Sequence, residues 1–346
     1  MDNIFSKKLF DFSISFYFPV SFCIVFIFSA NVFASDLQSA ISEFNDAHYS
    51  QARALFEAAA KDEGSKNTAL YYLGRIAFEN GEFEHAKDYL TQSVALEPNS
   101  SDEYYWLGRT YGELAQRANL FKQASYASSI HKYFQLAVDA DSKNVTALRG
   151  LFTFYILAPS IMGGSLEKAE ATLKNIRTLS PVDADIKTLD YLAKKEAYDK
   201  QLAQAVLLVK TYPESAEALF SAAHVFRNQK QLEAAIVNFE AASKLPITTQ
   251  NRFFVETARF HFGETCQWAN VRLDDAIASM ENYLSLKAGA KISDLSWPRW
   301  ILAKLYFQKG EREKYQRMRM QIDSDFVKEN KWMKEDIEKF DSNIKG

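Results

Sequence analysis

The sequence has few cysteines and no excess of positive charge. Its 346 residues include only Cys23 and Cys266, and the formal net charge is −3. Cys23 lies in an N-terminal apolar run, so the rest of the chain has no internal disulfide and its stability must come from packing. We expect Cys266 to be a small buried apolar residue. Lysine and arginine alternate with acidic residues instead of clustering, which argues against nucleic-acid binding.

The sequence also lacks the motifs of metal, phosphate and acyl chemistry. No HExxH, CxxC, GxSxG or GxxxxGK[ST] pattern occurs, and the histidines are dispersed at His48, His85, His131, His224 and His261. We expect no metal, no cofactor, no catalytic residue and no enzyme activity. Two alternatives stay open, a carrier of a small acidic ligand and an enzyme whose site no motif marks. An enclosed apolar cavity with convergent polar groups would favour either of them.

The N-terminal segment has the composition of an export signal. Lys7 and Lys8 precede the apolar run at 12–28, and Val32 and Ala34 have the small side chains that a cleavage site requires. We predict a signal peptide at 1–34, cleavage after Ala34, and a periplasmic or secreted protein. The alternative is an uncleaved anchor, because the run approaches the roughly 20 residues that span a bilayer. That anchor would be the only expected membrane contact.

A repeated unit follows the signal. The stretches YYLGR at 71–75 and YWLGR at 105–109 begin 34 positions apart. Between 67 and 100, two apolar stripes at helical spacing are joined at Asn80-Gly81, and Pro98 ends the unit. Such a helix pair cannot bury both apolar faces alone, so we expect stacked copies that share a continuous core.

This unit resembles the tetratricopeptide repeat family. The residues that carry the resemblance are Leu70, Gly74, Gly81, Phe83, Ala86 and Pro98. The resemblance implies an all-α, right-handed superhelical solenoid of antiparallel helix pairs. We expect this solenoid over 35–322, with about eight pairs and with inserted segments near 112–126 and 157–165 that depart from the family's usual unit.

Two smaller features have alternative interpretations. Gly163 and Gly164 precede a predicted helix, where backbone N–H groups can bind phosphate, but we favour a turn with Ser165 as the helix cap. Met333, Ile337 and Phe340 lie on one face of a predicted helix within 323–346. We favour a C-terminal capping helix over an amphipathic element for a partner.

The resemblance implies that the first helix of each pair lines a concave groove. Tyrosine and arginine there suit an extended peptide or protein with acidic groups. We therefore predict a non-catalytic scaffold or adaptor between proteins of the cell envelope, whose partner the sequence does not name. The alternative is that the tyrosines pack between repeats and the arginines form surface ion pairs. The predicted partner-binding residues are Tyr71, Arg75, Tyr105, Arg109, Arg149, Phe220, His224, Arg227, Trp300 and Lys304.

Overall fold

The computed structural model describes residues 37–287 and 295–345 and divides the chain into two compact units at Glu97 and Pro98. Every regular element within these ranges is a helix. This confirms the predicted all-α class built from helix pairs. The predicted signal at 1–34 lies outside the described residues. No helix in 37–287 or 295–345 is long and apolar enough to span a bilayer.

The first unit contains two helix pairs. A helical segment at 37–45 precedes α2 (Tyr49–Ala59), and α3 (Lys66–Glu79) precedes α4 (Phe83–Leu96). Gly81 turns the chain between α3 and α4 with a φ of +73°, a conformation that glycine adopts without strain. Gly74 brings these helices together, because a Cβ there would lie 2.6 Å from Leu90 Cγ. The two signature glycines are thus required by the turn and by the close packing of α3 against α4.

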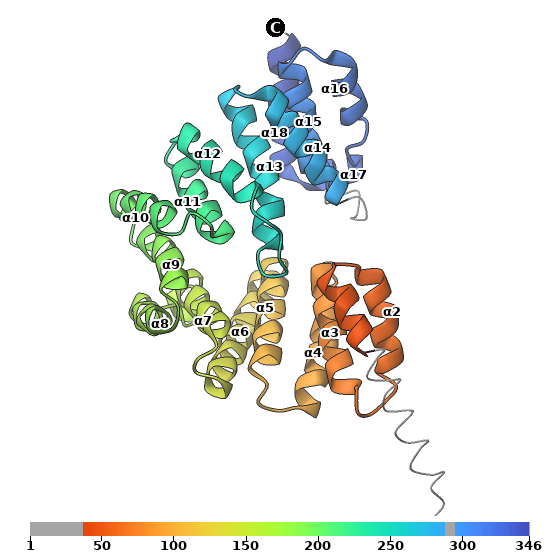
Figure 1. Cartoon of the computed structure of the whole chain (residues 1–346), viewed down its shortest axis with the longest axis vertical. Helices are drawn as coiled ribbons and strands as arrows, with labels where there is room; N and C mark the ends of the chain where they lie inside the picture. The colour runs from red at the N-terminus through yellow and green to blue at the C-terminus, as the bar shows by residue number, and fades with distance from the viewer. Residues whose placement is uncertain (1–36, 288–294, 346) are drawn as a thin grey trace, which may run out of the picture. The chain divides into compact units, whose positions relative to one another are not determined.

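The second unit continues with six helix pairs among its described residues, followed by two C-terminal helices (Figure 1). The helices are α5 (Ser101–Gln116), α6 (Leu120–Ala140), α7 (Val145–Leu157), α8 (Leu166–Leu179), α9 (Pro181–Lys194), α10 (Tyr198–Thr211), α11 (Ala216–Asn228), α12 (Leu232–Ser243), α13 (Arg252–Ala269), α14 (Leu273–Leu286), α15 (Ser296–Gln308), α16 (Arg312–Arg319), α17 (Ser324–Glu329) and α18 (Lys331–Lys345).

The first helices of successive pairs form one face of this unit. Each of them contacts the next, in the order α5, α7, α9, α11, α13 and α15. Successive second helices of the described part of the unit approach one another less closely than successive first helices do. A stack of helix pairs curves when the helices on one side lie closer together than those on the other. The first helices therefore line the inner face of the curve. Below, "inner face" means the surface made by these six helices.

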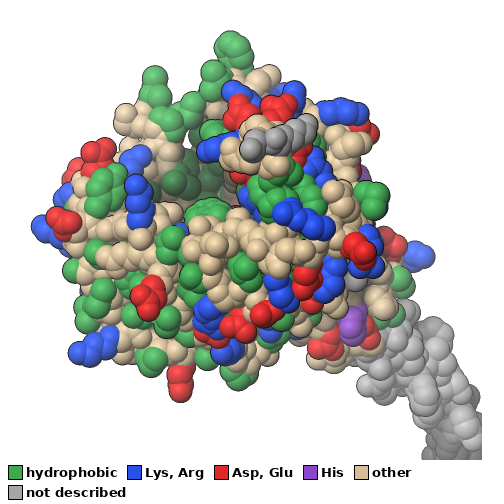
Figure 2. All heavy atoms as spheres, turned by 90° about the horizontal axis from the view of Figure 1, so that it is seen from above, with side chains coloured by type: hydrophobic (Ala, Val, Ile, Leu, Met, Phe, Trp, Pro, Cys, Tyr) green, Lys and Arg blue, Asp and Glu red, His purple; other side chains and the backbone are tan. Residues whose placement is uncertain are grey.

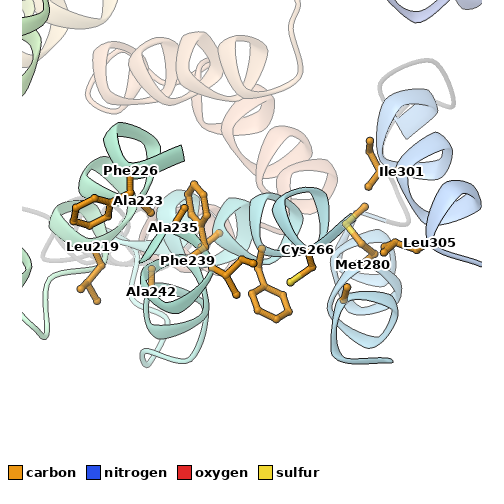
Figure 3. Close-up of a cluster of buried hydrophobic side chains, with 14 of the residues drawn as sticks. Leu219, Ala223, Phe226, Ala235, Phe239, Ala242, Cys266, Met280, Ile301 and Leu305 are labelled. Carbon is orange, nitrogen blue, oxygen red and sulfur yellow. The ribbon is translucent and has the colours of Figure 1, made fainter. Parts of the chain in front are cut away.

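The largest core cluster of the second unit runs from α9 to α18. Phe239 of α12, Cys266 of α13, and Trp300 and Ile301 of α15 are fully buried in it. Figure 3 shows this core as a continuous row of side chains from Leu219 to Leu305. The buried thiol of Cys266 has its pKa raised to about 12 by desolvation, which confirms the expectation that it is a packing residue.

The two predicted inserts have different structures. The first is helical: α5 continues to Gln116, and α6 begins at Leu120 after Asn119, which caps it by accepting from the Lys122 N–H at 3.1 Å. The extra residues therefore lengthen two helices, and they do not form the loop that an insertion suggests. The second insert forms the short 3-10 helix η1 (Ser160–Met162), and Ser165 caps α8 by accepting from the Lys168 N–H at 3.2 Å.

The C-terminal helix α18 packs along α15. Met333 is fully buried, and the Phe340 ring lies 5.1 Å from the rings of both Trp300 and Phe307. The opposite side of α18 is exposed, with Trp332 at 79%. The helix therefore uses its one apolar face to cover the last helix pair.

Candidate functional site

In the first unit, Tyr71 and Arg75 are half-buried and already in contact with other aromatic side chains. The guanidinium carbon of Arg75 lies 4.6 Å from the ring centroid of Phe44 and 5.6 Å from that of Tyr71. Such cation–π contacts hold the arginine in place at little cost in solvation. The predicted pair is thus on the surface of this unit, in an ordered arrangement.

Tyr105 and Arg109 of α5 repeat that arrangement in the second unit. Both are half-buried, and the guanidinium carbon of Arg109 lies 4.6 Å from the ring of Trp106 and 5.9 Å from that of Tyr105. The Tyr105 ring also lies 5.9 Å from Phe134 of α6. Part of each side chain therefore packs against the repeat, and part remains on the inner face.

Arg149 of α7 crosses the inner face. Its guanidinium donates to Asp183 of α9 at 2.5 Å and to both carboxylate oxygens of Glu217 of α11. Burial, the largest single effect, would lower the pKa of Arg149, but the charges of Glu217 and Asp183 and the hydrogen bonds to Glu217 together raise it. One arginine thus joins three successive first helices, and chain carboxylates neutralise its charge.

Phe220, His224 and Arg227 of α11 meet α13 in a second polar cluster. Arg227 Nη1 donates to Glu264 Oε2 at 2.6 Å, and Arg227 Nη2 donates to His224 Nδ1 at 3.1 Å. His261 Nδ1 lies 3.1 Å from Arg227 Nη1 and from Glu264 Oε2. The side chains of Arg227 and Glu264 are only 10% and 7% exposed. The structure therefore brings together three of the predicted residues.

The protonation states of this cluster follow from its burial. Desolvation is the main reason that the pKa of His224 falls to about 3, with smaller contributions from His261 and Arg227. Desolvation also lowers the pKa of His261. Burial alone would raise the pKa of Glu264, but the hydrogen bond from His261 and the charge of Arg227 lower it overall. A neutral imidazole at His224 can accept the Arg227 hydrogen bond.

The sequence interpretation missed the α13 side of this cluster. Gly263 is the counterpart of Gly74, because a Cβ there would lie 2.4 Å from Met280 Cγ in the following helix. Counting from that glycine places Phe260 and Glu264 where Tyr71 and Arg75 stand in the first unit. The glycine was the pattern that could have identified them. The rest of the stretch at 252–286 has only a weak apolar periodicity, so the helical register was not assigned from it.

An aromatic surface beside the cluster was also missed. The Phe220 ring lies 6.3 Å from Phe253 and 5.6 Å from Phe254 of α13. Phe253 is 64% exposed, and Trp268 near the end of the same helix is 51% exposed. Phe220, Phe253 and Phe254 together form the "aromatic surface" of the inner face.

Trp300 and Lys304 do not line an open groove, which corrects the prediction for these two residues. Trp300 is fully buried and Lys304 is 6% exposed. The indole Nε1 of Trp300 and the ammonium Nζ of Lys304 both donate to Asp336 Oδ2, at 2.6 and 2.8 Å. Asp336 belongs to α18, so the C-terminal helix occupies this part of α15 and excludes a partner from it.

A pocket of about 460 Å³ lies between α14, α15 and α16. Its lining includes Tyr306, whose hydroxyl donates to Glu281 at 2.5 Å, and Leu302. These two positions lie on the side of α15 opposite Trp300 and Lys304, because residues two apart point in opposite directions on a helix. The pocket contains none of the ten predicted residues.

Within residues 37–287 and 295–345, potential metal ligands do not gather at one place. Among the described residues no group of three or more His, Cys, Asp or Glu side chains is placed to hold a metal ion. Lysine and arginine side chains are interspersed with aspartate and glutamate on the face shown in Figure 2. On the inner face, Arg149 and Arg227 are paired with carboxylates of the chain.

Comparison with known proteins agrees with this architecture. Residues 37–102 match the tetratricopeptide repeat family. A tetratricopeptide repeat protein of Parabacteroides merdae is 13% identical, with 79% of this chain and 98% of that chain covered and a TM-score of 0.51. A thermophilic TPR protein of Thermus thermophilus is 20% identical over 56% of this chain and 99% of its own, with a TM-score of 0.48.

No curated protein matches the sequence. The structural similarity, at these identities, concerns the fold alone. The chain is an all-α helical repeat protein whose residues 37–102 match tetratricopeptide repeats.

Proposed function

We propose that this protein is a non-catalytic adaptor of the cell envelope that binds a protein partner on the inner face of its first helices. Helical repeat proteins use such extended inner surfaces for binding, and tetratricopeptide repeats generally mediate contacts between proteins. The observation that carries the proposal is the aromatic surface, in which the exposed Phe253 lies beside the half-buried Phe220 and Phe254. The envelope location rests on the predicted export signal.

The chemistry of the inner face favours an apolar or aromatic segment of the partner. Of the five predicted cations, Arg149, Arg227 and Lys304 already pair with carboxylates of the chain. An acidic group of a partner would compete with those carboxylates for the same donors. A large exposed aromatic side chain such as Phe253 loses water on binding without breaking any such pair, and aromatic anchors dominate interface energies.

Tyr105 and Arg109 extend the proposed surface toward the start of the unit. Tyrosine supplies a rigid contact area, and the arginine fork can bind backbone carbonyls or a carboxylate. The first helices between α5 and α13 are in contact throughout, so a single extended segment can reach both Arg109 and Phe253.

The test is site-specific photo-crosslinking in the exporting cell. A photoreactive amino acid is placed at Phe253 or at Arg109 in the full chain, and the crosslinked proteins are identified by mass spectrometry. Leu207 of α10, a second helix, is the matched control because it is exposed to 53%. We expect the same protein to crosslink from both inner-face positions and not from 207.

Two variants separate binding from folding. Phe253→Ser should abolish crosslinking from position 109, because the exposed anchor is lost. Leu207→Ser should leave it intact, because that exposed side chain lies on a second helix. Crosslinking of the same partner from position 207 alone, or from 109 with undiminished yield in Phe253→Ser, would contradict the proposed surface.

A further inference from the structure

One end of the second unit exposes four large apolar side chains. Leu120 and Phe121 begin α6 and are 76% and 91% exposed. Leu157 ends α7 at 72%, and Ile161 of η1 is 93% exposed. We call these four residues the end patch. They belong to the two segments at which the chain departs from the regular repeat.

The four residues lie at the same end of the unit because of the helix topology. Helices α6 and α7 are consecutive and pack against each other across the short connection at 141–144 (Figure 1). His131 of α6 lies 5.1 Å from the ring of Phe154 near the end of α7, so the beginning of α6 projects about two turns past the end of α7, at the same end of the unit. The 3-10 helix η1 contacts α6, and Met162 packs on the core cluster that contains Ala127, two turns into α6.

The local backbone fixes the exposure of this patch. Gly163 has a φ of +99°, and a Cβ on Gly164 would lie 1.8 Å from the carbonyl oxygen of Ala158. Only glycine allows this tight return of the chain, in which the Ser165 N–H donates to the Tyr155 carbonyl at 3.0 Å. Ile161 is thus held outside the core. Clustered apolar side chains kept in water indicate an interaction surface.

The charge around the patch identifies the kind of surface that it fits. The chain has 44 acidic residues, yet none occurs at 114–138 or at 142–166. Arg117 and Lys122 flank Leu120 and Phe121 in the sequence, and both are exposed. Apolar side chains flanked by cations are the pattern of proteins that lie on anionic membranes.

We propose that the end patch docks on the surface of an anionic phospholipid bilayer. Leu120, Phe121, Leu157 and Ile161 enter the boundary between headgroups and acyl chains, and Lys122 lies among the phosphates. This departs from the expectation that only the N-terminal segment touches a membrane. The proposal does not rest on the adaptor function, since α6, the last residue of α7 and η1 contribute the patch, whereas the aromatic surface lies on α11 and α13.

The test measures bilayer entry at single positions of the full chain. Phe121→Cys carries an environment-sensitive fluorophore, and Val237→Cys on α12, 55% exposed in the native chain, is the matched control. Both variants also carry Cys23→Ser, while buried Cys266, whose thiol pKa is about 12, labels poorly. Vesicles of phosphatidylcholine with increasing phosphatidylglycerol contain brominated lipid as the quencher. The readout is local, so contact of the N-terminal apolar run with the bilayer does not contribute.

We expect quenching at position 121 that grows with the phosphatidylglycerol fraction, and none at 237. Ile161→Ser should reduce the quenching at 121, and Lys122→Gln should reduce it about fivefold, the equivalent of the roughly 1 kcal/mol that one basic residue gains at an anionic surface. Equal quenching at both positions, or quenching independent of lipid charge, would overturn the proposal. The proposal would also be overturned if the fluorescence of the label at 121 changed on addition of envelope proteins but not on addition of vesicles. That result would assign the patch to a protein partner.

Discussion

Arg227 of α11 and Glu264 of α13, 37 positions apart in the sequence, form an ion pair with an Nη1 to Oε2 distance of 2.6 Å. The two side chains are nearly buried, and His224 and His261 lie against them. The pair joins two successive first helices beside the aromatic surface. Its main role is therefore to hold the inner face together.

Removing one partner of this pair should destabilise the protein strongly. In Glu264→Ala the guanidinium of Arg227 stays buried without its carboxylate, and breaking a buried pair in this way costs about 3 kcal/mol or more. Urea unfolding followed by circular dichroism measures the loss. Glu338→Ala on the exposed side of α18 is the control and should change the free energy of unfolding by less than about 0.5 kcal/mol. Equal stabilities of the two variants would mean that the buried pair does not contribute.

The same cluster predicts a loss of stability in mild acid. The pKa of His224 is about 3 in the folded protein and 6.5 in an unperturbed side chain. As pH falls below 6.5 the unfolded chain binds a proton that folded His224 does not, so the folded state loses up to about 1.4 kcal/mol per pH unit. His261, whose pKa is also lowered, adds to this loss.

The measurement compares unfolding free energies at pH 7.5 and 5.5. His224→Gln should show a smaller loss between these values than the native chain, because one of the titrating groups is gone. The control is His85→Gln, which removes a largely exposed histidine outside the cluster, and its loss of stability between these values should exceed that of His224→Gln. A steeper pH dependence in His224→Gln would show that the imidazole is protonated in the folded state.

Two glycines of α5 should respond in opposite directions to alanine. A Cβ at Gly108 would lie 2.8 Å from the Phe134 ring, whereas nothing lies within 4 Å of a Cβ at Gly112. Overpacking makes Gly108→Ala destabilising by about 1–3 kcal/mol. Gly112→Ala should stabilise by about 1 kcal/mol, because alanine favours the helix. Thermal and urea unfolding measure the change in the free energy of unfolding of both variants. A change of the same sign in both would contradict the packing argument.

The contact between α18 and α15 depends on one carboxylate. Asp336→Ala removes the acceptor of both Trp300 Nε1 and Lys304 Nζ. A buried lysine without its partner is costly, and we expect a loss of about 2–3 kcal/mol. Limited proteolysis should cut α18 faster in this variant. Glu335→Ala, at an exposed position of the same helix, should be cut at the native rate. Equal rates for both variants would show that the C-terminal helix is held by its apolar face alone.

The sequence determined the architecture because each repeat carries a helical periodicity and small residues where two helices must approach closely. Gly74, Gly108 and Gly263 mark the places where one helix approaches the next, and each has a neighbouring side chain within 3 Å of the Cβ that is missing. Helical periodicity and small residues are local properties, so they can be read without any long-range contact. The all-α class and the helix pairs follow from them.

Only the tertiary structure decided what the predicted inner-face residues do. Arg149 pairs with carboxylates that lie 34 and 68 positions away in the sequence. Lys304 pairs with Asp336, which lies 32 positions away. Periodicity indicates which side of a helix a residue occupies, but it does not show which distant helix packs there. Trp300 was therefore placed on a surface that α18 covers. The exposed Phe253 beside Phe220 became visible only when α11 and α13 were packed together, because exposure depends on every neighbour of a side chain.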